Sequence, residues 1–135
     1  MASWIVPTLG YIVFVGAAGV TAKLALRTIT WQQLVLWVPI VYICFAAGLV
    51  AFGGARLPFG VGGGWALATA ICAAAGLILL FVALSHGSAG KVVPATSAYP
   101  VVTLIGAALF LSERITVARG IGTALVIVGV AIISR

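Results

Sequence analysis

Hydroxyl and aromatic side chains recur along residues 92–111 at the spacing of one helix face. Thr96, Tyr99 and Thr103 lie three and four residues apart, and helix positions with that spacing point to the same side. Rings combined with hydroxyls suit a cavity that takes an amphipathic organic solute. The same stripe also suits close helix packing, in which hydroxyls bond to a neighbouring helix or to their own backbone. Two interpretations therefore stand, a solute cavity and a packing face.

Weaker stripes of the same kind run through residues 4–22 and 31–52, and they contain Tyr11 and Trp37. On the cavity interpretation we expect five residues to line it together: Tyr11, Trp37, Thr96, Tyr99 and Thr103. Pro100 lies beside the first stripe and removes a helix hydrogen bond, which favours a kink. We expect Pro100 to act as a hinge, with a static bend in the helix as the alternative.

The residues that catalysis requires are sparse. Glu113 is the one acidic residue and His86 the one histidine, so no pair of carboxylates, Ser/His/Asp set or metal cluster can be assembled. Cys44 and Cys72 stand alone inside apolar stretches, where we expect them to be packing residues. We therefore expect no enzyme, no cofactor and no metal site.

The elements that must position these residues are five apolar stretches of about 20 residues each, the length with which a helix crosses a bilayer. The chain is 64% hydrophobic and 6% charged, with a mean hydropathy of +1.37, so water-soluble classes are excluded. In hydrocarbon the backbone must satisfy its own hydrogen bonds, and the stretches are continuous, which favours helices over a β-barrel. The sequence predicts an all-α polytopic membrane protein, a single domain over residues 1–135, with spans at 4–22, 31–52, 65–84, 92–111 and 115–134.

The last two stretches are separated by Ser112, Glu113 and Arg114 alone, which requires a tight hairpin. We expect Glu113 and Arg114 to form the pair that fixes this hairpin. In the final stretch, small residues four apart predict a helix contact, either within the subunit or across a dimer. These residues are Ala118, Gly120, Gly122 and Ala124.

The positive charge is spread along the chain. The seven cations that produce the net charge of +6 stand singly or in pairs near the ends of the stretches, which indicates headgroup contact rather than nucleic-acid binding. Five spans place three of these cations on one side of the membrane and four on the other. Because the Lys/Arg excess of short loops sets orientation, this balance leads to the hypothesis of dual topology and an antiparallel homodimer. The alternative is a monomer or a parallel oligomer oriented by other means.

The second half of the chain resembles the EamA domain of the drug/metabolite transporter superfamily. A small-residue linker at 87–89 is followed by Pro94 and then by the runs YPVVT (99–103), FLSERIT (110–116), RGIG (119–122) and VGV (128–130). These are similar to the proline-containing fourth helix, the Gly-Glu-Arg hairpin and the glycine-rich fifth helix of the family, with Ser112 in place of the usual glycine. Family members commonly carry two such domains as an inverted repeat of ten helices. The resemblance therefore implies that this chain is half of such a transporter.

These observations lead to one main hypothesis and two alternatives. The main hypothesis is a transporter subunit in the inner (plasma) membrane of a bacterium or archaeon, in contact with the lipid bilayer. It moves a small neutral or amphipathic solute by alternating access, paired with itself or with a second EamA-like chain. One alternative is an accessory or assembly protein that transports nothing. The other is a subunit that flips a lipid-linked substrate, for which a groove open to lipid is the discriminating feature.

Overall fold

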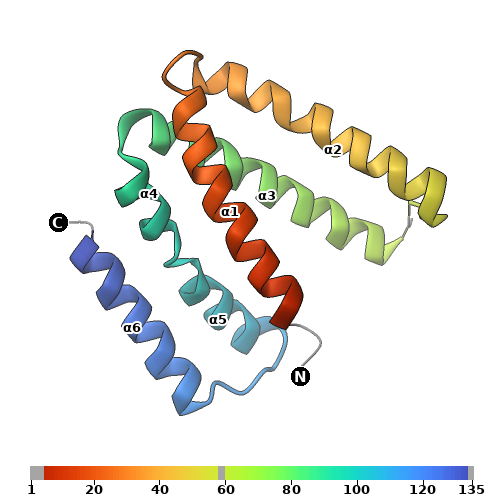
Figure 1. Cartoon of the computed structure of the whole chain (residues 1–135). Helices are drawn as coiled ribbons and strands as arrows, with labels where there is room; N and C mark the ends of the chain where they lie inside the picture. The colour runs from red at the N-terminus through yellow and green to blue at the C-terminus, as the bar shows by residue number, and fades with distance from the viewer. Residues whose placement is uncertain (1–4, 58–59, 134–135) are drawn as a thin grey trace. The chain divides into compact units, whose positions relative to one another are not determined.

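The computed structural model describes residues 5–57 and 60–133, and all the regular secondary structure in these ranges is helical (Figure 1). The helices are α1 (Ile5–Ala25), α2 (Trp31–Gly53), α3 (Val61–His86), α4 (Ala89–Thr96), α5 (Tyr99–Phe110) and α6 (Val117–Ile133). This confirms the all-α class. Trp4 and Ser134, the outer ends of the first and last expected spans, lie outside the described residues.

Four helical segments are long and apolar enough to cross a membrane. They are α1, α2, α3 and the 22-residue segment Ala89–Phe110, which contains α4 and α5. Helix α6 is shorter, and its 17 residues rise about 26 Å at about 1.5 Å per residue, near the lower limit for a span. The chain is therefore a polytopic membrane protein.

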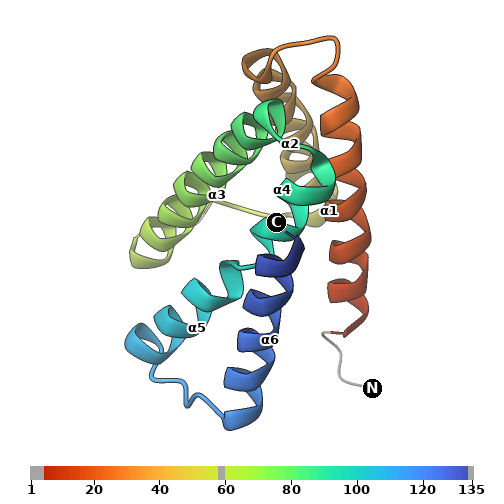
Figure 2. The same ribbon diagram turned by 90° about the vertical axis from the view of Figure 1, so that its left-hand side faces the viewer.

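The described chain divides into two compact units. One contains Val20–His86, and the other contains Met1–Gly19 together with Gly87–Arg135. Helix α1 contributes its first part to the second of these units and its last turns to the first. Figure 2 shows the same helices from the side.

In the unit Val20–His86, helices α2 and α3 pack against each other, and Ala22, Phe81 and Leu84 are buried. Helix α3 ends at His86, so its last carbonyls lack partners within the helix. Lys23 Nζ donates a hydrogen bond of 2.7 Å to the carbonyl oxygen of Leu84. A cation is also favoured at a helix C-terminus by the helix dipole. Lys23 thus ties the end of α1 to the end of α3, a contact that the sequence analysis did not foresee.

In the other unit, α4 packs against α6, and α1 meets α4 at Gly19. Gly19 is buried, and a Cβ atom added there would lie 2.7 Å from Val93 Cγ2. Carbon atoms in contact are normally 3.5 Å or more apart. The approach of α1 to α4 therefore requires a residue without a side chain at position 19.

The stretch 92–111, expected to be one bent helix, is two helices separated by Ser97 and Ala98. Pro100 has no N–H to donate to the Thr96 carbonyl, and its ring would clash with that carbonyl if the helix continued. Instead, the N–H groups of Ser97 and Ala98 donate to carbonyls three residues earlier, those of Pro94 and Ala95. Pro100 itself lies in the first turn of α5, where a missing N–H has no cost. The break follows from Pro100, while hinge motion stays a prediction.

The connection from α5 to α6 turns at Ser112, which has a positive φ of 53°. This left-handed conformation lets the Glu113 N–H donate to the carbonyl of Ala107 at 3.2 Å. A non-glycine residue is strained in this region of φ by about 1 kcal/mol.

We expect Ser112→Gly to raise the free energy of unfolding by about 0.5 to 1 kcal/mol, because glycine adopts a positive φ without strain. Ser97 is a matched control, since its φ of −64° is an ordinary right-handed value. Ser97→Gly should lower stability slightly. Unfolding of the purified protein in mixed detergent, followed by tryptophan fluorescence, measures both changes. Equal shifts from the two variants would contradict the prediction.

Candidate functional site

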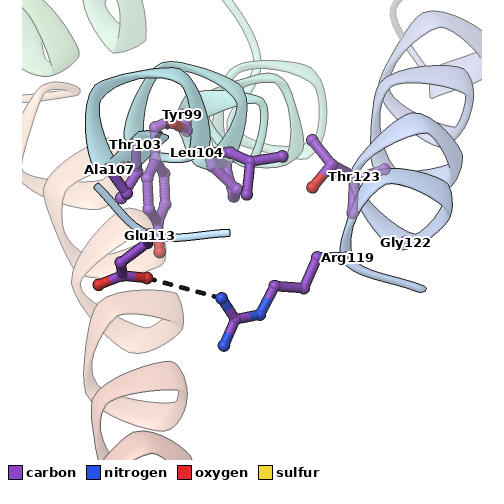
Figure 3. Close-up of a pocket in the computed structure, with 10 residues that line it drawn as sticks. Tyr99, Thr103, Leu104, Ala107, Glu113, Arg119, Gly122 and Thr123 are labelled. Atoms are coloured by element: carbon purple, nitrogen blue, oxygen red, sulfur yellow. Dashed lines mark hydrogen bonds and ion pairs between the residues drawn. The ribbon is translucent and has the colours of Figure 1, made fainter. Parts of the chain in front are cut away.

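A groove with a volume of about 530 Å³ lies between α5 and α6 (Figure 3). Helix α5 contributes Tyr99, Pro100, Thr103, Leu104 and Ala107. Helix α6 contributes Arg119, Gly122, Thr123 and Val126, and Glu113 of the connecting loop completes the lining. All ten residues belong to one unit of the chain. The groove is within the size range of small-molecule sites.

Helical spacing explains which side chains meet in the groove. Tyr99 and Thr103 are one turn apart on α5, and Arg119 and Thr123 are one turn apart on α6. Figure 3 shows these two pairs facing each other across the groove. A Cβ atom on Gly122 would meet no atom within 4 Å, so the groove is open in front of α6. The walls are mainly apolar, and the charged groups gather at the end nearest the connecting loop.

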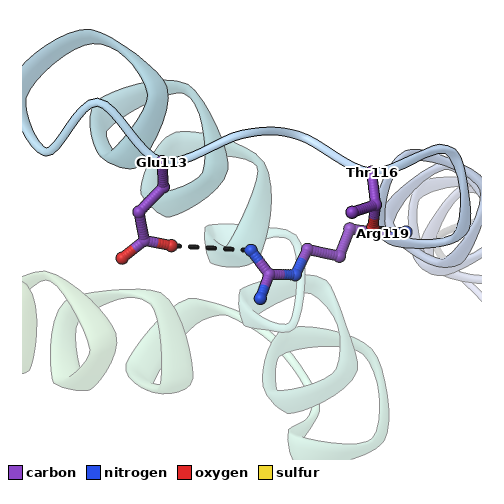
Figure 4. Close-up of polar contacts among 3 residues, drawn as sticks. All are labelled: Glu113, Thr116 and Arg119. Carbon is purple, nitrogen blue, oxygen red and sulfur yellow. Dashed lines mark hydrogen bonds and ion pairs between the residues drawn. The ribbon is translucent and has the colours of Figure 1, made fainter.

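The charged end of the groove is an ion pair. Arg119 NH1 lies 3.5 Å from Glu113 Oε2, and the two side chains are 58% and 53% exposed (Figure 4). An ion pair this exposed contributes less than about 1 kcal/mol. Glu113 is thus paired with Arg119 in the structure, and the expected role of Glu113 and Arg114 in fixing the hairpin stays a prediction. Glu113 follows the left-handed turn at Ser112, and Arg119 lies in the first turn of α6.

Arg119 occupies an unusual position for a cation. Thr116 precedes α6, and its Oγ1 accepts the Arg119 N–H at 3.4 Å, so Arg119 is the third residue of the helix. An acidic or amide side chain is favoured at this position, because the N-terminus of a helix carries partial positive charge. Glu113 supplies the missing negative charge from outside the helix.

The two threonine hydroxyls of the expected stripe bond to their own helices. Thr96 Oγ1 donates to the Val93 carbonyl at 2.7 Å, and Thr103 Oγ1 donates to the Tyr99 carbonyl at 3.4 Å. The short first bond is typical of a threonine satisfied by its own helix. The second is beyond the usual length of a strong hydrogen bond. The Thr103 hydroxyl is therefore held only weakly by its own helix.

The structure brings together Tyr99 and Thr103, two of the five expected lining residues, along with Pro100. Thr96 lies at the end of α4 and does not line the groove. Tyr11 is exposed on α1, and Trp37 is exposed on α2 in the other unit. Arg119 and Thr123 were missed, although their spacing of four residues was a readable signal. The sequence predicts only a headgroup contact for Arg119.

The small residues of the last helix divide between two faces. Gly122 lines the groove, whereas Gly120 lies two residues away, about 200° round the helix. A Cβ atom on Gly120 would meet nothing within 4 Å, and Ala118 and Ala124 are exposed. The predicted helix contact through these residues stays a prediction. Within residues 5–57 and 60–133, no three His, Cys, Asp or Glu side chains gather as metal ligands would.

Comparison with known proteins gives one family and one relative. The model of the EamA-like transporter family matches residues 2–135. An uncharacterized protein of Methanocaldococcus jannaschii is 37% identical over 70 residues, which are 52% of this chain and 51% of the relative. The match thus spans about half the length of either protein. No solved structure matches the chain. With a family match over nearly its whole length, the chain belongs to the EamA-like transporter family.

Proposed function

We propose that the protein is a transporter subunit that binds a small neutral or amphipathic solute in the groove between α5 and α6. The chain is an integral multi-pass membrane protein of a transporter family. The observation that carries the finer proposal is the groove itself, in which Tyr99 and Thr103 face Thr123 and Arg119 between otherwise apolar walls. Such a combination orients an amphipathic molecule by a few polar groups while apolar walls cover the rest of it.

Alternating access requires an element that moves, and the break between α4 and α5 supports this part of the proposal. Broken helices commonly form the substrate sites of transporters near the middle of the bilayer. Here the break precedes Tyr99 and Pro100, which are both lining residues of the groove. A change of angle between α4 and α5 at Ser97 and Ala98 would move one wall of the groove relative to α4.

The groove has one wall in each of two helices of a single chain, and we propose that a second, oppositely oriented copy completes the transport path. The near balance of cations between the two sides of the membrane supports insertion in both orientations. An antiparallel pair would form the inverted repeat that many transporters contain. A second EamA-like chain is the alternative partner.

Fusion of a cytoplasm-active and a periplasm-active reporter, each to the C-terminus, tests the dual orientation. Comparable activity of both reporters, normalised to expression, is the expected result. Activity of one reporter alone would exclude the antiparallel homodimer and direct attention to a different partner chain.

The lipid-linked alternative is favoured by one specific observation, which is that the groove is open along its side. A substrate with a lipid tail needs such an opening in order to move its head across the membrane while its tail stays in hydrocarbon. This second function uses the same residues as the first.

We expect the double variant Tyr99→Leu with Thr103→Leu to lower solute flux about fivefold, since each lost polar contact costs roughly 0.5 kcal/mol or more. Purified protein in liposomes, supplied with a panel of neutral amino acids and an amphipathic fluorescent dye, provides the measurement. Tyr42→Leu is the control, because Tyr42 is exposed on α2 and does not line the groove. A wild-type protein that accelerates no solute, while co-purifying with another protein, would favour the accessory role instead.

A further inference from the structure

We propose that the groove between α5 and α6 binds a membrane phospholipid with a zwitterionic head, in which a phosphate and a primary ammonium group are linked by a short spacer. The phosphate lies at Arg119, the ammonium at Glu113, and one acyl chain follows the apolar wall formed by Leu104, Ala107, Gly122 and Val126. The inference rests on the groove of the proposed function, but it requires binding only and not transport.

The position of the groove along the two helices supports a lipid. Helix α5 belongs to the membrane-spanning segment Ala89–Phe110, and α6 is the apolar helix that follows it. The loop between two consecutive spans lies at a membrane surface, so Glu113 and the first turn of α6 are at the depth of the lipid headgroups. The rest of the groove extends from there toward Tyr99 and Val126, into the hydrocarbon. The charged end and the apolar wall therefore match the two parts of a lipid in the right order.

The open side of the groove also favours a lipid as the ligand. The walls are mainly apolar. A Cβ atom added at Gly122 would meet no protein atom within 4 Å, so the space in front of this residue is open. In a bilayer, an apolar furrow between two lipid-facing helices is filled by hydrocarbon rather than by water. A soluble zwitterion would match the charges but would leave this wall uncovered.

The charged pair is suited to a head with both signs of charge. One oxygen of Glu113 and one nitrogen of Arg119 are 3.5 Å apart, so the contact is longer than a strong charge-assisted hydrogen bond. The second carboxylate oxygen and the remaining guanidinium N–H groups have no partner among the described residues. A phosphate accepts two parallel N–H bonds from a guanidinium, and a primary ammonium donates to a carboxylate. Both side chains thus retain the bonding capacity that such a head requires.

The location of Arg119 within α6 gives an independent reason. A cation in the first turn opposes the helix dipole. Local rules of this kind are broken most often at functional sites. A phosphate at Arg119 would also lie near the positive N-terminus of α6, where anions are favoured.

Lipid retention tests the proposal directly. The full chain is reconstituted in nanodiscs that contain equal amounts of phosphatidylethanolamine, phosphatidylglycerol and phosphatidylcholine with identical acyl chains, and the lipids kept after extraction into detergent are counted by native mass spectrometry. We expect phosphatidylethanolamine to be retained about fivefold over the other two, because it alone offers both a phosphate and a hydrogen-bonding ammonium. Equal retention of the three lipids would overturn the proposal.

Three variants assign the contacts. Glu113→Gln should abolish the preference for phosphatidylethanolamine while phosphate binding remains, and Arg119→Gln should lower the retention of all three lipids. Gly122→Leu should fill the groove and also lower all three, without a clash, since its Cβ meets no atom within 4 Å. Gly120→Leu is the matched control on the other face of α6, where an added Cβ atom also meets open space. Retention by Gly122→Leu equal to that of Gly120→Leu would exclude the groove as the binding site.

Two further measurements complete the test. One distinguishes a bound lipid from a soluble molecule with the same head, and the other distinguishes failure of the lipid site from failure of transport. Soluble glycerophosphoethanolamine, which has the head but no acyl chains, should compete poorly, and competition equal to that of the lipid would replace the lipid by a soluble zwitterion. Solute flux is measured on the same preparations. Loss of lipid preference in Glu113→Gln with no flux in any protein would support the lipid site and reject transport. Solute flux in a protein that shows no lipid preference would support transport and reject the lipid site.

Discussion

Replacing Gly19 with leucine should lower the free energy of unfolding by about 2 to 3 kcal/mol, the upper part of the range for overpacking a close contact. A Cβ atom at this position would lie 2.7 Å from Val93 Cγ2, and the whole leucine side chain would have to fit beyond it. Valine is stiff about its first side-chain torsion, so Val93 cannot turn aside cheaply. The contact between α1 and α4 would have to open to admit the side chain.

A second glycine on the same helix supplies the control. Gly16 lies three residues before Gly19, and a Cβ atom there would meet nothing within 4 Å. Gly16→Leu should leave stability unchanged or raise it by up to about 1 kcal/mol, because leucine has the higher helix propensity. The two variants therefore differ in sign. Detergent unfolding followed by tryptophan fluorescence measures both, and equal destabilisation by the two would disprove the close contact.

A double-mutant cycle identifies the partner of Gly19. Gly19→Ala combined with Val93→Ala removes the atom that the new Cβ would strike. The penalty of Gly19→Ala should then disappear, and the coupling between the two changes should exceed about 0.5 kcal/mol, as it does for residues in contact. Additive effects would show that the two residues are independent.

Replacing Lys23 with methionine should cost about 1.5 to 3 kcal/mol, the range for a hydrogen bond to a charged group. Lys23 Nζ donates to the Leu84 carbonyl at 2.7 Å, and Leu84 is fully buried. Methionine keeps the length and the apolar stem of lysine but leaves the carbonyl at the end of α3 without its donor. The loss is large because water does not easily replace the donor at a buried helix end.

Two lysine variants make this result specific. Lys91→Met removes the same charge from an exposed position in α4, and it should change stability by less than about 0.5 kcal/mol. Lys23→Arg keeps a cation with hydrogen-bond donors and should recover part of the lost stability. The same unfolding assay applies. If Lys23→Met behaves like Lys91→Met, then Lys23 serves the membrane surface as the sequence first indicated.

The helices themselves were readable from composition and length. In hydrocarbon each backbone group needs an internal partner, so an apolar stretch of about 20 residues must be helical. Thus α2 begins at Trp31 as expected and ends at Gly53, one residue past the expected boundary. The break before α5 follows from Pro100, since a proline removes one hydrogen bond wherever it stands in the chain. These features depend on local chemistry and on the solvent.

The groove depends on information of a different kind. Periodicity showed that Tyr99 and Thr103 share a face, but it could not show that α6 lies opposite that face and contributes Arg119 and Thr123. Nor could periodicity show that Arg119 lies 3.5 Å from Glu113, beyond the turn at Ser112. The hydrogen bond of Lys23 was not readable from the sequence either, since the carbonyl that it binds lies 61 residues away.

The sequence by itself thus determined the class of the protein, its membrane-spanning helices and the site of the break, because these follow from transfer to hydrocarbon and from backbone bonding within one segment. Only the tertiary structure decided which helix faces meet, which cation joins Glu113 and which glycine carries a close helix contact. Those outcomes depend on the angles of turns and on the fit of side chains between segments distant in the chain. The spacing of residues along one helix does not contain that information.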